Sequence, residues 1–135
     1  MNTEALISSH RLLPHPFEGH WRETEHEDGS YRAGLHLLTA TEEAGWHTVD
    51  AEVTLTLEEG GPASVALSHT GVTAYGHKLL APGDSLKIGP GVLRSLSCLG
   101  AYVLLKVRIA PDVAVGERQL MPDDWFPNPE GRPKR

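Results

Sequence analysis

Alternating apolar and polar residues predict a β-strand at residues 51–57, which read AEVTLTL. The alternation places aliphatic side chains on one face of this strand and Glu52, Thr54 and Thr56 on the other. In an ordinary sheet with one solvated face, the three polar side chains would meet water. From the residues alone, that is the simplest interpretation of this strand.

Two further strands follow from the same kind of pattern. Residues 101–109, AYVLLKVRI, alternate so that Lys106 and Arg108 share one face. A solvated face explains both cations without any function, and a pocket for a carboxylate or phosphate is the alternative. Residues 34–39, GLHLLT, form the third strand and place His36 between leucines, either as a packed residue or as a ligand.

Turn signals separate these strands and count against a helical bundle. Fourteen glycines and ten prolines occur in 135 residues. Only residues 3–13 are expected to be helical, with Pro14 preventing continuation. The pattern predicts an all-β antiparallel sandwich or barrel with a short N-terminal helix. The turn signals, which combine glycine with proline or aspartate, lie at residues 28–29, 60–62, 82–84 and 89–91.

Length and composition indicate one soluble domain. We expect it to span residues 1–135, with flexible ends at 1–5 and 128–135. The formal net charge of -6 argues against a nucleic-acid partner. No segment approaches the ~20 apolar residues that cross a bilayer, so we expect no membrane partner. The single cysteine, Cys98, lies in an apolar run and predicts a buried thiol and a cytoplasmic location.

Several segments together resemble one protein family. Residues 12–24 read LLPHPFEGHWRET, which is similar to the PHPEGGYYRET-like motif of the Cupin_5 type, a cupin family often described only as a domain of unknown function. The segments GLHLLT, HTVDAEV, GGP and VLLKVRIAP resemble later segments of that family in the same order. The resemblance covers nearly the whole chain.

This resemblance implies a fold and a place for the ligand. The fold is the cupin double-stranded β-helix, a jelly-roll barrel with a pocket between its two sheets, and it usually forms a homodimer. The resemblance also implies that Glu52, Thr54 and Thr56 face the pocket rather than water. The expected partner is therefore a small molecule.

The PHP motif contributes the first barrel strand. Gly19 supplies the backbone freedom for the preceding turn, and Trp21 is expected to pack inward. Arg22 and Glu23 fall on opposite faces of that strand. We expect Glu23 in the pocket, because a buried Arg22 would need a carboxylate partner.

The chain departs from the metal-binding pattern of cupins. Their first motif combines H-x-H with a later glutamate; His47 and Glu52 match it, but Val49 replaces the second histidine. Their second motif, P-x-G-x-x-H, is matched best by residues 89–95, where Arg94 stands in the histidine position. A catalytic metal normally takes three or more such ligands. We therefore expect no cofactor, and a divalent metal held by His47 and Glu52 is the alternative.

A histidine and a carboxylate in one cavity suffice to move a proton. We expect His47 to act as acid or base and Glu52 to orient its ring or serve as its partner. The leading hypothesis is a metal-independent isomerase, epimerase or dehydratase of a small sugar-like or acidic metabolite. The alternatives are a non-catalytic ligand-binding module and a mononuclear-metal enzyme. The expected ligand-binding residues are Glu23, His36, Thr54, Thr56 and Tyr102.

The C-terminal segment contains Trp125 and Phe126 between prolines and acids. We expect these aromatic residues to tie the chain down onto an apolar strip of the barrel. A lid or a dimer contact is the alternative.

Overall fold

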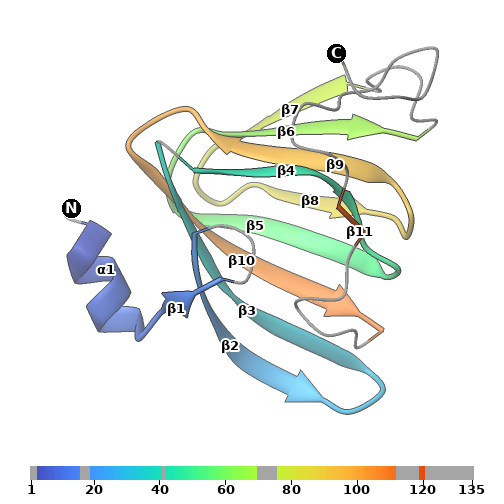
Figure 1. Cartoon of the computed structure of the whole chain (residues 1–135), viewed down its shortest axis with the longest axis horizontal. Coiled ribbons are helices and arrows are strands. Elements are labelled where there is room, and N and C mark those ends of the chain that lie inside the picture. Colours follow the sequence, from blue (N-terminus) through green and yellow to red (C-terminus); the bar gives the residue numbers. More distant parts are fainter. Residues whose placement is uncertain (1–2, 16–18, 41, 70–75, 112–118, 121–135) are drawn as a thin grey trace.

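The computed structural model describes residues 3–15, 19–40, 42–69, 76–111 and 119–120. These residues form two antiparallel β-sheets and one short helix (Figure 1). The mostly β-structure confirms the predicted fold class. The predicted packing of Trp125 and Phe126 and the predicted flexible end at 128–135 lie outside the described residues.

The first sheet has six strands, and the three strands predicted from alternation lie side by side in it. Its order is β1-β2-β3-β10-β5-β8. All of its pairings are antiparallel. The strands are β1 (Leu13–Pro14), β2 (His20–Glu27), β3 (Tyr31–Thr39), β10 (Tyr102–Ala110), β5 (Glu52–Gly60) and β8 (Ser85–Ile88).

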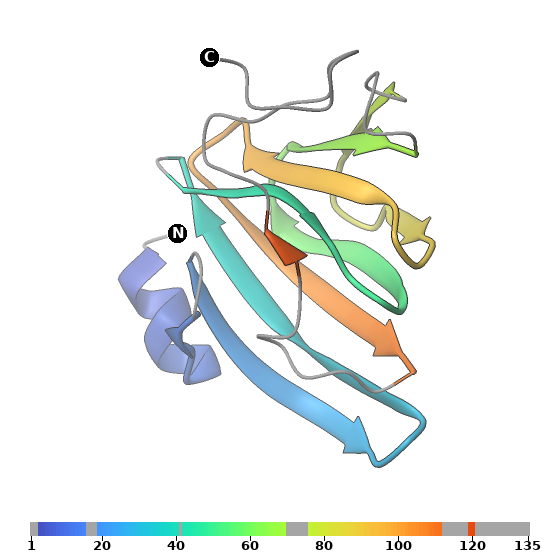
Figure 2. The same ribbon diagram turned by 45° about the vertical axis from the view of Figure 1, so that its right-hand side comes forward.

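The second sheet has five strands and lies face to face with the first (Figure 2). Its order is β11-β4-β9-β6-β7, again with antiparallel pairing. The strands are β11 (Gln119–Leu120), β4 (Glu43–Thr48), β9 (Leu93–Cys98), β6 (Ala63–Ser68) and β7 (Gly76–Leu80).

The four predicted turn signals all lie at connections between strands, and the one at 60–62 starts at the last residue of β5. They join β2 to β3, β5 to β6, β7 to β8 and β8 to β9. At the β7–β8 turn Gly83 has a φ of 94°, and the Asp84 amide donates to the Ala81 carbonyl over 2.9 Å. Glycine adopts this left-handed backbone without the steric cost of a side chain.

The N-terminal helix α1 (Thr3–His10) is shorter than predicted. Arg11 adopts a φ of 55°, and the Leu12 amide donates to the Ile7 carbonyl over 2.9 Å. This Schellman-type ending satisfies the last carbonyls of the helix. It also turns Leu12 into an apolar cluster, so tertiary packing rather than Pro14 ends the helix.

Two apolar clusters hold the layers together. The larger cluster fills the space between the sheets and includes the buried Cys98. The smaller cluster contains Leu6 of α1, Leu12, Leu37 and Leu104, so α1 packs on the outer face of the six-stranded sheet (Figure 1). Within the described ranges, no helix is long and apolar enough to cross a membrane.

Candidate functional site

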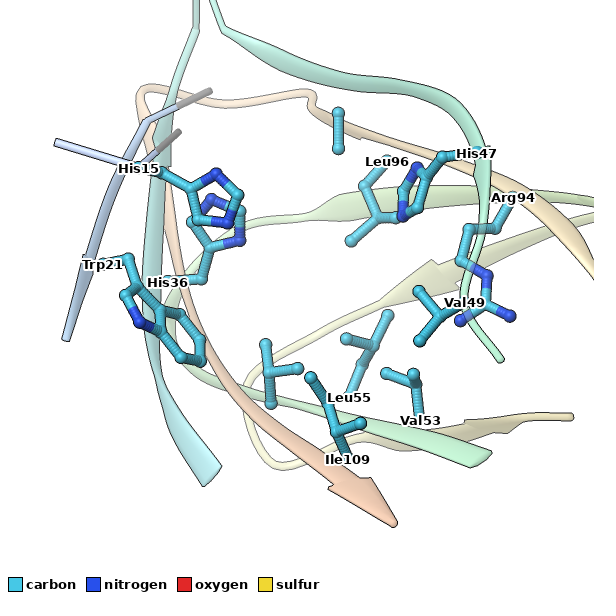
Figure 3. Close-up of a pocket in the computed structure, with 12 residues that line it drawn as sticks. His15, Trp21, His36, His47, Val49, Val53, Leu55, Arg94, Leu96 and Ile109 are labelled. Carbon is cyan, nitrogen blue, oxygen red and sulfur yellow. The ribbon is translucent and has the colours of Figure 1, made fainter. Parts of the chain in front are cut away.

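A cavity opens between the two sheets at one end of the larger cluster (Figure 3). Its volume is about 70 Å³. One wall is aliphatic and comes from the six-stranded sheet. The lining residues are His15, Trp21, His36, Ala44, His47, Val49, Val53, Leu55, Arg94, Leu96, Val107 and Ile109.

His36, one of the expected ligand-binding residues, lines this cavity. It is buried on β3, and its ring stacks on that of His15 with the ring centroids 4.6 Å apart and the planes 16° apart. Trp21 meets both rings edge-on, at centroid distances of 6.1 Å and 6.2 Å. Trp21 therefore packs inward, as predicted, and the three rings form one end of the cavity.

His47 also lies in the cavity, and a β-bulge places it there. Ala44 and His47 both line the cavity although their separation would put them on opposite faces of a regular strand. The pairing of β4 with β9 shifts register between these two residues. The extra residue in β4 turns His47 inward, where it is 5% exposed.

A backbone carbonyl orients the His47 ring. The Nδ1 atom lies 2.7 Å from the carbonyl oxygen of Gly45. A carbonyl oxygen only accepts, so Nδ1 carries the hydrogen and donates it. In the neutral ring, Nε2 is then the nitrogen that accepts a proton, and the ring points into the cavity (Figure 3).

Arg94 lies directly opposite His47 on β9, and its side chain is 1% exposed. Its Nε donates to the Val92 carbonyl over 3.1 Å, and its Nη2 donates to the Val92 and Gly89 carbonyls over 3.0 Å and 3.1 Å. Burial lowers the pKa of the guanidinium to about 10, so it stays charged at neutral pH. The buried Nη1 makes no hydrogen bond.

The structure places the polar side chains of β5 outside the cavity. Glu52 is exposed, and Thr54 and Thr56 lie on the same outer face, where Thr56 Oγ1 is 2.8 Å from Ser85 Oγ. Val53 and Leu55 line the cavity instead. The geometry implied by the resemblance is wrong here, because the aliphatic face of β5 is the one that packs against the second sheet.

Glu52 therefore cannot partner His47. His47 lies on β4 of the five-stranded sheet and is buried, whereas Glu52 begins β5 of the six-stranded sheet, after a turn. Glu52 is exposed, and the next residue, Val53, is the one that lines the cavity. The expected orienting role belongs to the Gly45 carbonyl, which the sequence did not single out.

Glu23 and Tyr102 also lie away from the cavity lining. Glu23 Oε1 is 3.0 Å from Arg32 Nη1, and the Glu23 side chain is 34% exposed. Tyr102 packs with the smaller cluster on the outer face, and its hydroxyl donates to Glu59 Oε2 over 2.8 Å. Glu23 is thus paired with an arginine and Tyr102 with a glutamate, and neither residue lines the cavity.

The described residues do not fit a metal ion. They contain no group of three or more histidine, cysteine, aspartate or glutamate side chains able to hold one. His47 points into the cavity and Glu52 into solvent, so this pair cannot ligate the same ion. The metal alternative therefore has no support from the chain's own side chains in these ranges.

The two cations of β10, Lys106 and Arg108, lie on the outer face of the six-stranded sheet, where they contact other side chains of that face. The Arg108 guanidinium carbon lies 4.5 Å from the centre of the Tyr31 ring, and Lys106 Nζ is 3.9 Å from Glu25 Oε1. Lys106 and Arg108 are both exposed. The solvated-face interpretation of these two residues fits this arrangement.

Sequence reasoning missed two polar residues of the cavity lining, His15 and Arg94. His15 fits no ligand spacing in the sequence, yet the β1–β2 pairing brings it over His36. Arg94 was noted only as a missing histidine. A polar residue that alternates with Val92, Leu96 and Cys98 on one strand face was the available signal.

Comparison with solved structures identifies the fold as that of the cupins. A protein from Shewanella oneidensis superposes with a TM-score of 0.78 at 13% identity, covering 90% of this chain and 85% of that one. The cupin domain of Cnp3 from Schizosaccharomyces pombe gives 0.60 at 16% identity, covering 69% and 64%. KdgF from Halomonas sp. gives 0.64 at 14% identity, covering 78% and 92%. At these identities the likeness shows the fold alone.

Other structures of the same fold include enzymes. They are a DMSP lyase from Ruegeria pomeroyi at 16% identity and an oxalate decarboxylase from Lactobacillus farciminis at 14% identity. Scans of protein-family models and of curated proteins return no match. The Cupin_5 resemblance stays a prediction.

Proposed function

We propose that this cupin-fold chain binds a small organic molecule between its sheets and that His47 moves a proton on it without a metal. The observation that carries the proposal is the hydrogen bond from His47 Nδ1 to the Gly45 carbonyl. It fixes the ring in the orientation and tautomer of a general base inside a largely apolar cavity. The cavity and the enzymes found among its fold neighbours support this proposal.

The proton transfer needs no other reagent. His47 Nε2 accepts a proton from a substrate atom, and the electrons of the broken bond stay on the substrate. The imidazolium then returns the proton to a second substrate atom, which completes an isomerisation, or to a departing hydroxyl group, which releases water. His36 lies in the same cavity as a second imidazole for an epimerisation.

Binding without turnover is the alternative, and one experiment separates the two. The full chain is incubated in D₂O with a pool of small hydroxy acids, keto acids and sugars, and mass spectrometry records deuterium uptake and new products. The wild-type protein should introduce deuterium into one compound. His47→Gln should abolish that uptake, whereas His77→Gln, which changes an exposed histidine on β7, should not.

Two outcomes would contradict the proposal. Equal deuterium uptake by wild-type protein and His47→Gln would remove His47 as the base. A compound that is retained by the protein but never changed would assign a binding function instead. The homodimer, the cytoplasmic location and the Cupin_5 assignment are separate proposals that this experiment does not address.

A further inference from the structure

Arg94 keeps a polar atom without a partner in the cavity wall. Among the described residues, two buried side-chain atoms make no hydrogen bond, Arg94 Nη1 and Glu23 Oε1. Glu23 Oε1 lies 3.0 Å from Arg32 Nη1, so its charge is paired. Arg94 forms no ion pair with a carboxylate in this part of the chain.

The guanidinium is also held in place. Its Nε and Nη2 atoms donate to the carbonyls of Val92 and Gly89, which belong to the β8–β9 turn and its exit. These bonds use one edge of the planar group and leave Nη1 on the other. A buried donor without an acceptor costs about 1–3 kcal/mol, and such donors are rare in folded proteins.

The rest of the cavity wall is apolar. Val53, Leu55, Val107 and Ile109 form its aliphatic side, and Val49 also lines it (Figure 3). This aliphatic side offers no hydrogen bonds, so a polar group placed against it would lose its water without gaining a partner. The wall therefore suits a molecule with one charged end and an apolar body.

We infer that the cavity selects a small monocarboxylate, whose carboxylate accepts hydrogen bonds from Arg94 Nη1 while its apolar body lies against the aliphatic side of the cavity. This inference rests on the proposed function, because it names the ligand class of the same cavity. Guanidinium and carboxylate match in charge and in planar hydrogen-bond geometry.

The charge count favours one carboxylate over a phosphate or a diacid. Arg94 is the lining cation, and the other polar lining side chains are the imidazoles of His15, His36 and His47. A second negative charge would be buried with no fixed cation opposite it. Because His47 faces Arg94 across β4 and β9, a carboxylate held at Arg94 brings the adjacent carbon atoms towards the His47 ring.

Matched probes test the inference. Isovalerate and benzoate are compared with their neutral isosteres, isovaleramide and benzamide, and with succinate and chloride, by NMR titration of the full chain at neutral pH. We expect each monocarboxylate to bind wild-type protein at least tenfold more tightly than its amide. Arg94→Met should remove this preference and leave the affinity for the amide unchanged.

Two further variants protect the test against a simple loss of folding. Arg94→Lys keeps the charge but not the planar donor group, so it should retain part of the preference. Arg32→Met removes an arginine outside the cavity lining and should leave the preference intact. Thermal unfolding of each variant checks that it is folded.

The possible results lead to different conclusions. Equal affinity for acid and amide, or a preference that survives Arg94→Met, would overturn the inference and leave cavity binding intact. Chloride or succinate binding as tightly as the monocarboxylates would overturn the ligand class. No binding of any probe would count against the proposed function as well.

Discussion

His47 and Arg94 face each other across adjacent antiparallel strands, and both side chains are buried in the same cavity wall. His47 is oriented by the Gly45 carbonyl, and Arg94 is oriented by the Val92 and Gly89 carbonyls. Each group has one edge fixed by the backbone. An imidazole and a fixed guanidinium are thus placed opposite each other in the cavity wall.

Arg94→Met should change how stability depends on alkaline pH. Burial lowers the pKa of Arg94 to about 10 in the folded protein, below its value in the unfolded chain, so unfolding at a pH between the two values takes up a proton. The wild-type free energy of unfolding therefore gains a contribution that rises with pH, by about 1 kcal/mol between pH 9 and pH 11. Urea unfolding at both pH values measures this effect. From pH 9 to pH 11, the free energy of unfolding of the wild-type protein should rise relative to that of Arg94→Met by that amount.

Arg32→Met is the matched control for this measurement. Arg32 is partly exposed and pairs with Glu23, so its removal should cost the same at pH 9 and at pH 11. A constant difference between wild-type protein and Arg94→Met would show that the Arg94 charge is not desolvated in the folded state.

Glu52→Gln should leave ligand binding unchanged. Glu52 is exposed on the outer face of β5, whereas its near neighbour Leu55 lines the cavity. We expect the affinity for isovalerate to change less than about twofold in Glu52→Gln, an amount that corresponds to under 1 kcal/mol. Leu55→Phe, which places a ring in the cavity, should weaken the same affinity at least tenfold by about 1.4 kcal/mol or more. NMR titration measures both, and a strong effect of Glu52→Gln would place that carboxylate in the site after all.

Gly34→Ala should disturb the aromatic end of the cavity. A Cβ atom at Gly34 would lie 2.5 Å from Trp21 Cη2 and 2.5 Å from the Arg22 carbonyl oxygen. The ring and the neighbouring strand must move, which we expect to cost about 1–3 kcal/mol. Urea unfolding followed by tryptophan fluorescence measures the cost and reports the displaced ring.

Gly76→Ala is the control for that substitution. A Cβ atom at Gly76 meets nothing within 4 Å, so the stability and the native fluorescence should stay close to those of the wild-type protein. Equal losses of stability and equal fluorescence changes for the two substitutions would mean that Trp21 does not pack against Gly34.

Glu59→Gln should make Tyr102 ionise at lower pH. The Tyr102 hydroxyl donates to Glu59, and this hydrogen bond raises the pKa of the phenol above its ordinary value of 10.0. The stability that the pair contributes is complete below pH 10 and is lost as the pH rises through the raised pKa. Phenolate absorbance should appear earlier in Glu59→Gln, and its stability should fall less steeply above pH 10. Glu58→Gln, which changes the exposed adjacent carboxylate, should leave the phenolate titration as in the wild-type protein.

The sequence by itself determined the β-strands and the turns. Alternation located β3, β5 and β10, and the glycine-containing turn signals located four of the connections between strands. These features are local, because side-chain direction repeats every two residues and glycine permits left-handed turns. The plain interpretation of β5, with its threonines towards water, was also correct at this level, and the family resemblance replaced it with a wrong one.

Only the tertiary structure decided which polar groups meet. The bulge in β4 turned His47 inward, sheet register set Arg94 opposite it, and the β1–β2 pairing laid His15 on His36. Each of these depends on pairing between segments far apart in the chain, and a shift by one residue would send every side chain to the other face. Motif spacing paired Glu52 with His47, although the two residues lie on strands of different sheets and Glu52 faces outwards.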